Sequence, residues 1–253
     1  MIPKLISIGP FTVYSYGFLL FLGFIAGIFL ARKRAKRFGL EPDSIYDLAF
    51  WAILLGILGA WGLFIVQDLP HYTKNPREIF TQFSGLTSFG GLLGGFLGVL
   101  IYVKRAKQRL WPVLDTVAPS FLLAHAIGRI GCLLNGCCHG FACDLPWSIP
   151  VQGLPGRYHP AQAYDSLMNI FMLLVLLRFE RRGLAAGQTF GAMLFLHGIT
   201  RVIYELWRAG TSSTTISGLP ITEAQVAAAL ISIVGLVVYL TGTRRPKAEV
   251  VLD

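Results

Sequence analysis

Two arginines occur inside long apolar stretches of the sequence, where a charge needs a partner. Arg129 lies near the end of the apolar run 112–134, and Arg201 lies near the end of the run 187–207. A charged side chain at membrane depth is costly and normally faces the interior of a helix bundle or a polar ligand. A guanidinium grips phosphate through two parallel N–H···O bonds. These two residues therefore predict a phosphate-binding site inside a membrane.

The composition supports a membrane setting for these arginines. Of the 253 residues, 54% are hydrophobic and only 14% are charged, and the mean hydropathy is +0.61. This is too apolar for an ordinary soluble domain of the same size. The formal charge of +9 would suit a protein that binds nucleic acid. We exclude that class because the basic residues lie in short loops between apolar segments.

The apolar segments define the expected elements. Seven segments have close to the 20 or so residues that a bilayer-spanning helix needs. They are 11–31, 46–67, 84–103, 112–134, 161–178, 187–207 and 221–241. We therefore predict an all-α integral membrane protein with seven transmembrane helices, which form a single polytopic membrane domain over residues 1–253.

The basic residues indicate how these helices are oriented. Clusters at 32–37, 104–109, 178–182 and 244–247 hold 15 of the 22 Lys and Arg residues, and each follows an odd-numbered segment. Because cytoplasmic loops carry the excess of Lys and Arg, the N-terminus is expected outside and the C-terminus in the cytoplasm. The first segment lacks the charge pattern and the small-residue cleavage site of a signal peptide, so we expect it to be retained.

Helical rise places both arginines at a similar depth. With this orientation, segments 112–134 and 187–207 run outward from the cytoplasm. At 1.5 Å per residue, Arg129 lies about 25 Å along its helix and Arg201 about 20 Å along. Three residues of two other segments are expected in the same outer layer: Tyr16, Gly90 and Gly91. We therefore expect a polar site that opens toward the outer leaflet.

The four cysteines fall within twelve positions, as Cys132, Cys137, Cys138 and Cys143. They do not form the dispersed framework that disulfides make in small secreted domains. With His139 they are rich in soft ligands, but their spacing differs from the C-x2-C pairs of common zinc sites, so we expect no bound metal. A disulfide from Cys143 to Cys137 or Cys138, and the packing of Cys132 as a small apolar residue, stay open.

Several motifs resemble those of one family. Residues 128–140 follow G-R-x-G-x-x-x-N-G-x-x-x-G and are similar to the signature of bacterial prolipoprotein diacylglyceryl transferases. Residues 159–165 resemble the H-P-x-Q-x-Y-E motif of this family, and residues 201–208 resemble its R-F-x-x-E-x-x-R motif. Tyr16 and the pair 90–91 also match family positions. The resemblance covers nearly the whole chain.

The resemblance implies an activity and a set of functional residues. The family moves a diacylglyceryl group from phosphatidylglycerol to the thiol of the lipobox cysteine in a prolipoprotein signal peptide, and it releases glycerol phosphate. The implied partners are phosphatidylglycerol, this signal peptide and the lipids of the bacterial inner membrane, without a cofactor and without nucleic acid. The implied catalytic residues are Arg129, Arg201 and His159. The implied substrate-binding residues are Tyr16, Gly90, Gly91, Asn135, Gly140, Gln162, Tyr164, Glu205 and Arg208.

The chain departs from the family pattern at polar positions. Trp61, Phe89, Cys132 and Cys137 stand where the family commonly has polar or charged residues. A phenyl ring cannot accept a proton, so a general base at the position of Phe89 cannot operate unchanged. Four histidines are alternative candidates for this base: His125, His139, His159 and His197. Lowering of the thiol pKa by the arginines alone is another alternative.

Other interpretations stay open beside the transferase. A divergent family member with another acceptor, or a non-catalytic protein that binds or transports lipids or anions, would use the same arginines. A transporter would be expected to show repeat symmetry, and the sequence has no internal repeat. Structural roles are also expected: an ion pair between Arg201 and Glu205, helix capping by Thr222 and Glu223, and helix packing by the glycines of segment 84–103.

Overall fold

The structure is a computed structural model in which residues 2–8, 11–81, 85, 87–209 and 221–243 are described. It divides into two compact units. Unit 1 comprises Met1–Gly39 and Leu114–Asp253, and unit 2 comprises Leu40–Val113. The single polytopic domain expected from the sequence stays a prediction, and each unit is described by itself.

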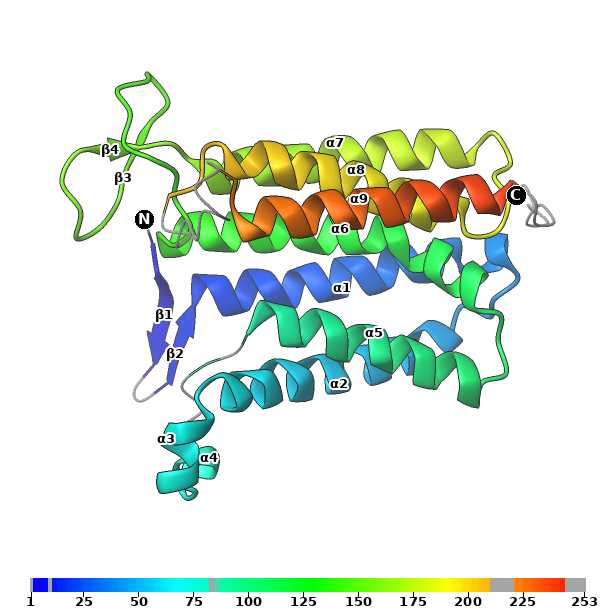
Figure 1. Ribbon diagram of the computed structural model, residues 1–253, viewed down its shortest axis with the longest axis horizontal. Helices are drawn as coiled ribbons and strands as arrows, with labels where there is room; N and C mark the ends of the chain where they lie inside the picture. Colours follow the sequence, from blue (N-terminus) through cyan, green and yellow to red (C-terminus); the bar gives the residue numbers. More distant parts are fainter. Residues whose placement is uncertain (1, 9–10, 82–84, 86, 210–220, 244–253) are drawn as a thin grey trace. The chain divides into compact units, whose positions relative to one another are not determined.

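Unit 1 consists mainly of long helices that lie side by side (Figure 1). They are α1 (Ser15–Ala35), α6 (Leu110–Asn135), α7 (Ala161–Glu180), α8 (Gln188–Glu205) and α9 (Glu223–Gly242), with a short 3-10 helix, η1 (Lys36–Phe38), after α1. The first residues of α6, up to Val113, belong to unit 2. α1, α7 and α9 begin, and α6 and α8 end, at the end of the unit that carries the candidate site (Figure 1).

Apolar and small side chains hold these helices together. The buried core joins Leu122 of α6, Met172 of α7 and Met193 of α8. α1 approaches α6 closely because it presents glycines, and a Cβ on Gly23 would lie 2.9 Å from the carbonyl oxygen of Ala124. Glycines at positions 191, 198 and 235 serve the same purpose between α8 and α9. Without a hydrophobic driving force in lipid, such close backbone contact is what stabilises helix pairs.

Unit 2 is a pair of long helices with short helices after the first of them. They are α2 (Ser44–Gln67), α3 (Leu69–Lys74), α4 (Glu78–Thr81) and α5 (Ser88–Arg105). A Cβ on Gly59 of α2 would lie 2.9 Å from the Cα of Gly94, and a Cβ on Gly98 would lie 2.8 Å from the Cα of Ala52. The predicted packing role of the α5 glycines is therefore confirmed for Gly94 and Gly98.

The helical part of the fold prediction holds, but the chain is not purely α-helical. Two small antiparallel sheets occur: β1 (Lys4–Ile8) pairs with β2 (Phe11–Tyr14), and β3 (Ile149–Pro150) pairs with β4 (Arg157–Tyr158). The expectation that the first helix begins at residue 11 is wrong. Thr12 and Val13 are β-branched and favour the extended backbone that continues to Tyr14 (φ −86°, ψ 140°), so α1 begins at Ser15.

Five helical segments in the described part of the chain are long and apolar enough to cross a membrane. They are Ser15–Phe38, Ser44–Gln67, Leu110–Asn135, Ala161–Glu180 and Glu223–Gly242. Large apolar side chains point away from the protein on them, such as Phe29 (68% exposed) and Phe171 (67% exposed). Exposure of this size is normal where the surroundings are lipid and unfavourable in water. The structure is that of a multi-pass membrane protein.

A buried ionic cluster fixes the ends of four helices opposite the candidate site. Arg34 of α1 forms an ion pair with Glu180 of α7 and donates a hydrogen bond to the carbonyl oxygen of Asp115 (3.0 Å). The carboxylate of Asp115 in turn accepts hydrogen bonds from the backbone N–H groups of Gly187 (2.6 Å) and Phe190 (2.8 Å). The sequence analysis used Arg34 only to orient the chain, whereas the structure shows that it also joins α1, α6, α7 and α8.

Candidate functional site

Both predicted arginines contact one aromatic ring. The Cζ atom of Arg129 lies 5.3 Å from the ring centroid of Tyr204, and the Cζ atom of Arg201 lies 4.9 Å from the same centroid. Tyr204 is completely buried (0% exposed) in α8. Cation–π contacts of this kind hold a guanidinium plane in a defined place. α6 and α8 therefore bring Arg129 and Arg201 together, although the sequence analysis did not identify Tyr204.

The Arg129 side chain is held at its Nε atom. Its Nε lies 2.6 Å from Oδ2 of Asp165 and donates a hydrogen bond to Nε2 of His125 at 3.1 Å. Asp165 is itself held by Nδ2 of Asn169, which donates to Oδ1 at 2.8 Å. A guanidinium has five N–H donors, and four of them are on the two η nitrogens. No acceptor for these η nitrogens is found among the described residues, so they are the part of Arg129 suited to an anion.

The side chain of Arg201 is held by a carboxylate of its own helix. Its Nη1 lies 3.0 Å from Oε2 of Glu205, and Nη1 of Arg208 lies 3.9 Å from the same oxygen. The expected ion pair between Arg201 and Glu205 is confirmed. Together with Arg129 and Asp165, the group contains three guanidinium groups and two carboxylates, which leaves one positive charge in excess. An excess of positive charge on partly buried side chains favours an anionic ligand.

Two histidines lie beside the arginine group, which consists of Arg129, Arg201 and Arg208 with their carboxylate partners. The rings of His125 and His197 have centroids 5.5 Å apart, and the ring of Phe121 contacts both. Because Nε2 of His125 accepts from Arg129, its hydrogen must be on Nδ1 when the ring is neutral. Of the four histidines that the sequence suggested as a base, His125 is the one that contacts Arg129 directly.

The loop after α6 pairs with the chain just after α8, where Gly140 and Arg208 form an isolated antiparallel bridge. The N–H of Gly140 donates to the carbonyl oxygen of His159 (2.9 Å), and the N–H of Phe141 donates to the carbonyl oxygen of Trp207 (3.0 Å). A Cβ on Gly140 would lie 2.6 Å from the Cβ of His159. The structure therefore gives Gly140 a packing role, and its predicted role in substrate binding stays a prediction.

His159 belongs to an aromatic group at the start of α7. Its Nδ1 lies 3.2 Å from the hydroxyl of Tyr164, which also accepts a hydrogen bond from Nε1 of Trp147 (2.7 Å). The ring of Tyr164 packs edge-on against Trp207, with centroids 5.6 Å apart. Two predicted site residues are thus in contact with each other, beside the loop that carries Gly140. Their roles in catalysis and binding stay predictions.

The remaining predicted residues of unit 1 surround the end of α6. Gln162 is completely buried, and its Nε2 donates to the carbonyl oxygen of Cys137 at 2.5 Å. Tyr16 is the second residue of α1 and lies beside α6, where a Cβ on Gly131 would lie 3.4 Å from its Cα. Asn135 is the last residue of α6 and is exposed. Gln162 and Tyr16 therefore border the same turn that follows α6.

Gly90 and Gly91 belong to unit 2, where they pack against α2. A Cβ on Gly90 would lie 2.8 Å from the Cβ of Leu63, and a Cβ on Gly91 would lie 3.6 Å from the Cβ of Ala60. Only Gly90 is too close to α2 for a side chain, whereas a Cβ at position 91 would make an ordinary van der Waals contact. Their predicted contact with a lipid headgroup stays a prediction.

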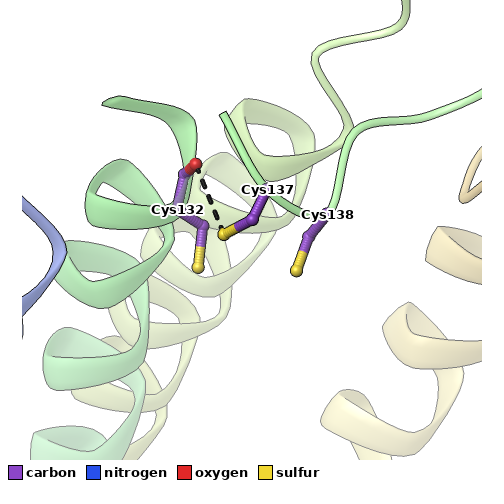
Figure 2. Close-up of side chains that lie close together, drawn as sticks. All are labelled: Cys132, Cys137 and Cys138. Carbon is purple, nitrogen blue, oxygen red and sulfur yellow. Dashed lines mark hydrogen bonds between the residues drawn. The ribbon is translucent and has the colours of Figure 1, made fainter. Parts of the chain in front are cut away.

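Three of the four cysteines converge in the turn after α6 (Figure 2). The Sγ atoms of Cys132, Cys137 and Cys138 all lie within 4.8 Å of one another. All four cysteines are free thiols, so the disulfide that was left open for Cys143 is not formed in this structure. The adjacent thiols of Cys132 and Cys137, together with the nearby charge of Arg129, lower the pKa of the Cys138 thiol. Sγ of Cys137 donates a weak hydrogen bond to the carbonyl oxygen of Cys132 at 3.7 Å. The group is therefore suited to holding at least one thiolate.

The comparisons with known proteins agree with this geometry. The sequence profile of the family described as "Prolipoprotein diacylglyceryl transferase" matches residues 3–241. The chain belongs to the prolipoprotein diacylglyceryl transferase family. It is 33% identical to a phosphatidylglycerol–prolipoprotein diacylglyceryl transferase of Clostridium tetani, with 82% of this chain and 86% of the relative covered. It is also 33% identical to the protein of the same name from Clostridioides difficile, with 93% of each chain covered.

The match extends over almost the whole chain in a third relative. The phosphatidylglycerol–prolipoprotein diacylglyceryl transferase of Synechococcus elongatus is 30% identical, with 98% of this chain and 91% of the relative covered. Membership of the prolipoprotein diacylglyceryl transferase family, which the motifs around Arg129, His159 and Arg201 indicated, is confirmed. The family is one of lipoprotein-modifying transferases with membrane helices.

Proposed function

We propose that this protein transfers a diacylglyceryl group from phosphatidylglycerol to the lipobox cysteine thiol of prolipoproteins in the bacterial inner membrane, and releases glycerol phosphate. The observation that supports this most directly is the arginine group. Arg129 and Arg201 both contact the ring of Tyr204, and the surrounding ion pairs leave one positive charge in excess. A phospholipid headgroup is the anion that a membrane supplies to such a site.

The chemistry requires stabilisation of a leaving phosphate. The bond that breaks joins the glyceryl carbon to the phosphate oxygen, and its electron pair stays on the phosphate. The bond that forms joins the thiolate sulfur to that carbon. The η nitrogens of Arg129, together with the guanidinium of Arg201, donate to the phosphate oxygens and stabilise their growing charge. Asp165 and His125 hold Arg129 by its Nε and keep this face pointed at the ligand.

We propose that two further helices cross the membrane in addition to the five apolar spans. α5 and α8 have 18 residues each and coincide with the two other segments predicted to span. We therefore assign seven transmembrane helices, with the N-terminus outside and the C-terminus in the cytoplasm. In this orientation the arginine group lies in the outer layer of the membrane, where the signal peptide of an exported lipoprotein presents its cysteine. The distribution of Lys and Arg supports this assignment.

A reconstituted transfer assay tests the proposal. Purified protein in phosphatidylglycerol vesicles is expected to increase the mass of a lipobox peptide by one diacylglyceryl group and to release one glycerol phosphate for each peptide modified. A peptide with serine in place of cysteine, and vesicles of phosphatidylcholine alone, serve as controls. The proposal is wrong if the folded protein leaves the cysteine peptide unmodified, or if it modifies both peptides equally.

A further inference from the structure

The end of α6 and the turn after it bring three thiols close together (Figure 2). Cys132 is on the last turns of α6, and the chain reverses through Gly136 (φ 80°) and Cys138 (φ 62°), both in the left-handed region. A non-glycine residue in this region costs about 1 to 2 kcal/mol. Gln162 fastens the turn by donating to the carbonyl oxygen of Cys137. The turn therefore keeps Cys137 and Cys138 close to Cys132, even though Cys138 adopts an unfavourable backbone conformation.

The spacing of the thiols suits a soft cation. A tetrahedral zinc ion with Zn–S bonds of about 2.3 Å holds its sulfur ligands about 3.8 Å apart. The three Sγ atoms already lie within 4.8 Å of one another, and cysteine rotamers can supply the remaining closure. Thiolate is the ligand that zinc and other soft divalent ions prefer. Three protein ligands with one open position are typical of catalytic zinc sites, whereas structural sites carry four.

The arginine group offsets the charge of a metal ion bound by three thiolates. A dication bound by three thiolates carries one negative charge. The arginine group as a whole has one positive charge in excess of its carboxylates. Binding a dication to three thiolates therefore leaves the combined group close to neutral, which limits the cost of burying it.

We infer that Cys132, Cys137 and Cys138 bind one zinc ion, and that the fourth position of this ion receives the thiol of the acceptor cysteine. The second part rests on the proposed function, and the first part does not. The inference replaces our expectation from the sequence that no metal binds, because spacing along the chain did not show that the three sulfur atoms converge.

This site supplies a way to ionise the acceptor thiol that needs no base at the position of Phe89. Phe89 cannot act as a base, whereas a thiol that coordinates zinc loses its proton to solvent at neutral pH. The sulfur of the coordinated thiolate attacks the glyceryl carbon, the S–C bond forms, and the C–O bond to phosphate breaks with its electron pair on the phosphate. No electron is gained or lost overall. The product is a neutral thioether, a weaker ligand than a thiolate, so it leaves the ion.

The thiols and the phosphate site are close enough for this step. Arg129 and Cys132 are three residues apart on α6, so they lie on the same face with Cβ atoms about 5 to 6 Å apart. We therefore place a phosphate held by Arg129 on the same side of α6 as the thiol group. The acceptor sulfur and the reacting carbon meet without a large movement of either site.

Cobalt(II) titration tests the metal site separately from transfer. The purified metal-free protein is expected to bind one Co²⁺ per chain, with the intense near-ultraviolet thiolate-to-cobalt absorption of a site with three sulfur ligands, and Zn²⁺ should displace it. Cys132→Ser, Cys137→Ser and Cys138→Ser should each lose this absorption. Cys143→Ser is the matched control, because Cys143 is outside the converging group, and it should retain the absorption.

Two results would overturn the metal site. The first is that the unsubstituted protein shows no thiolate-to-cobalt absorption when Co²⁺ is added, although all four of its thiols react after denaturation. The other is a count of two reactive thiols in the unreduced and metal-free protein, which would show a disulfide within the group. An equal loss of the absorption in Cys143→Ser would also contradict the assigned ligands.

Transfer assays then test the fourth position. Removal of the metal with a chelator should lower the transfer rate by about 100-fold or more, because a general base typically accelerates a reaction by at least this factor. Added Zn²⁺ should restore the rate. The lipobox peptide should change the Co²⁺ spectrum, and the peptide with serine should not. Transfer that is unchanged without metal would refute this role while leaving the proposed function intact. Cobalt binding without any transfer would refute the proposed function and the fourth-position role, and would leave the metal site standing.

Discussion

Replacing Arg129 tests the proposed phosphate clamp and separates it from a structural role. In Arg129→Ala, the η nitrogens that we assign to the phosphate are lost. Each charge-assisted hydrogen bond contributes about 1.5 to 3 kcal/mol. Two such bonds to the leaving phosphate correspond to about 3 to 6 kcal/mol, so we expect a transfer rate about 10² to 10⁴-fold lower. Lysine should not restore it, because a point charge cannot contact Asp165 and a phosphate in the same fork geometry.

The same substitution also affects stability, which must be separated from activity. It leaves Asp165 buried without its ion-pair partner at 2.6 Å, and breaking a buried pair on one side costs about 3 to 5 kcal/mol. The double variant Arg129→Ala/Asp165→Asn removes both charges. Its melting temperature is therefore expected to be higher than that of Arg129→Ala, while its transfer rate stays as low.

The assay is the conversion of a lipobox peptide in phosphatidylglycerol vesicles, with each variant checked by thermal unfolding. A matched control is Arg34→Met/Glu180→Leu, which replaces another buried arginine–carboxylate pair of the same unit. About 27 Å separates Arg34 from Tyr16 along α1, so this control should change stability and leave transfer close to normal. If the Arg129→Ala/Asp165→Asn variant recovers the parent rate, the guanidinium is not needed for transfer and the clamp is wrong.

Other predictions follow from single contacts. Gly140→Ala should destabilise the folded protein by about 1 to 3 kcal/mol because the new methyl group collides with packed neighbours, whereas Gly17→Ala, which has open space, should not; denaturant unfolding compares them. Glu180→Ala should lower the melting temperature strongly, and replacing its arginine partner as well should recover much of the loss. Tyr204→Phe should keep the transfer rate near that of the parent, and Tyr204→Leu should lower it, because each cation–π contact contributes about 0.5 to 2 kcal/mol. In a cysteine-free background, Pro3→Cys should react with a membrane-impermeant thiol reagent added to intact cells, and reaction only after lysis would contradict an external N-terminus.

The helices were largely predictable from the sequence because length and hydropathy are local properties. Each of the seven apolar segments coincides with a helix, and α6 (Leu110–Asn135) differs from the predicted 112–134 by two residues at its start and one at its end. The expected cap of the last helix is also confirmed, since Thr222 and Gln225 form a capping box at the start of α9. Such caps depend on residues only three positions apart. The extended segment before Ser15 was missed because a short apolar run is compatible with strand or helix.

The arginine site was partly predictable. Charge inside an apolar run marked Arg129 and Arg201, and helical rise indicated their common depth, because the cost of burying a charge and the rise per residue do not depend on neighbouring helices. Asp165 lies within the motif at residues 159–165, but the sequence analysis assigned it no role. Its contact with Arg129 depends on how α7 is rotated against α6, and one sequence does not reveal that rotation.

Only the tertiary structure decided which side chains share a contact. Three features depend on distances between separate segments: the contact of two guanidinium groups with the ring of Tyr204, the ion pair that joins Arg34 to Glu180 across 146 positions, and the proximity of three thiols. Hydropathy and spacing determine that a helix forms and where it ends. The partners on its faces are determined by close packing, which is set by glycines such as Gly23 and Gly191 and by every side chain around them.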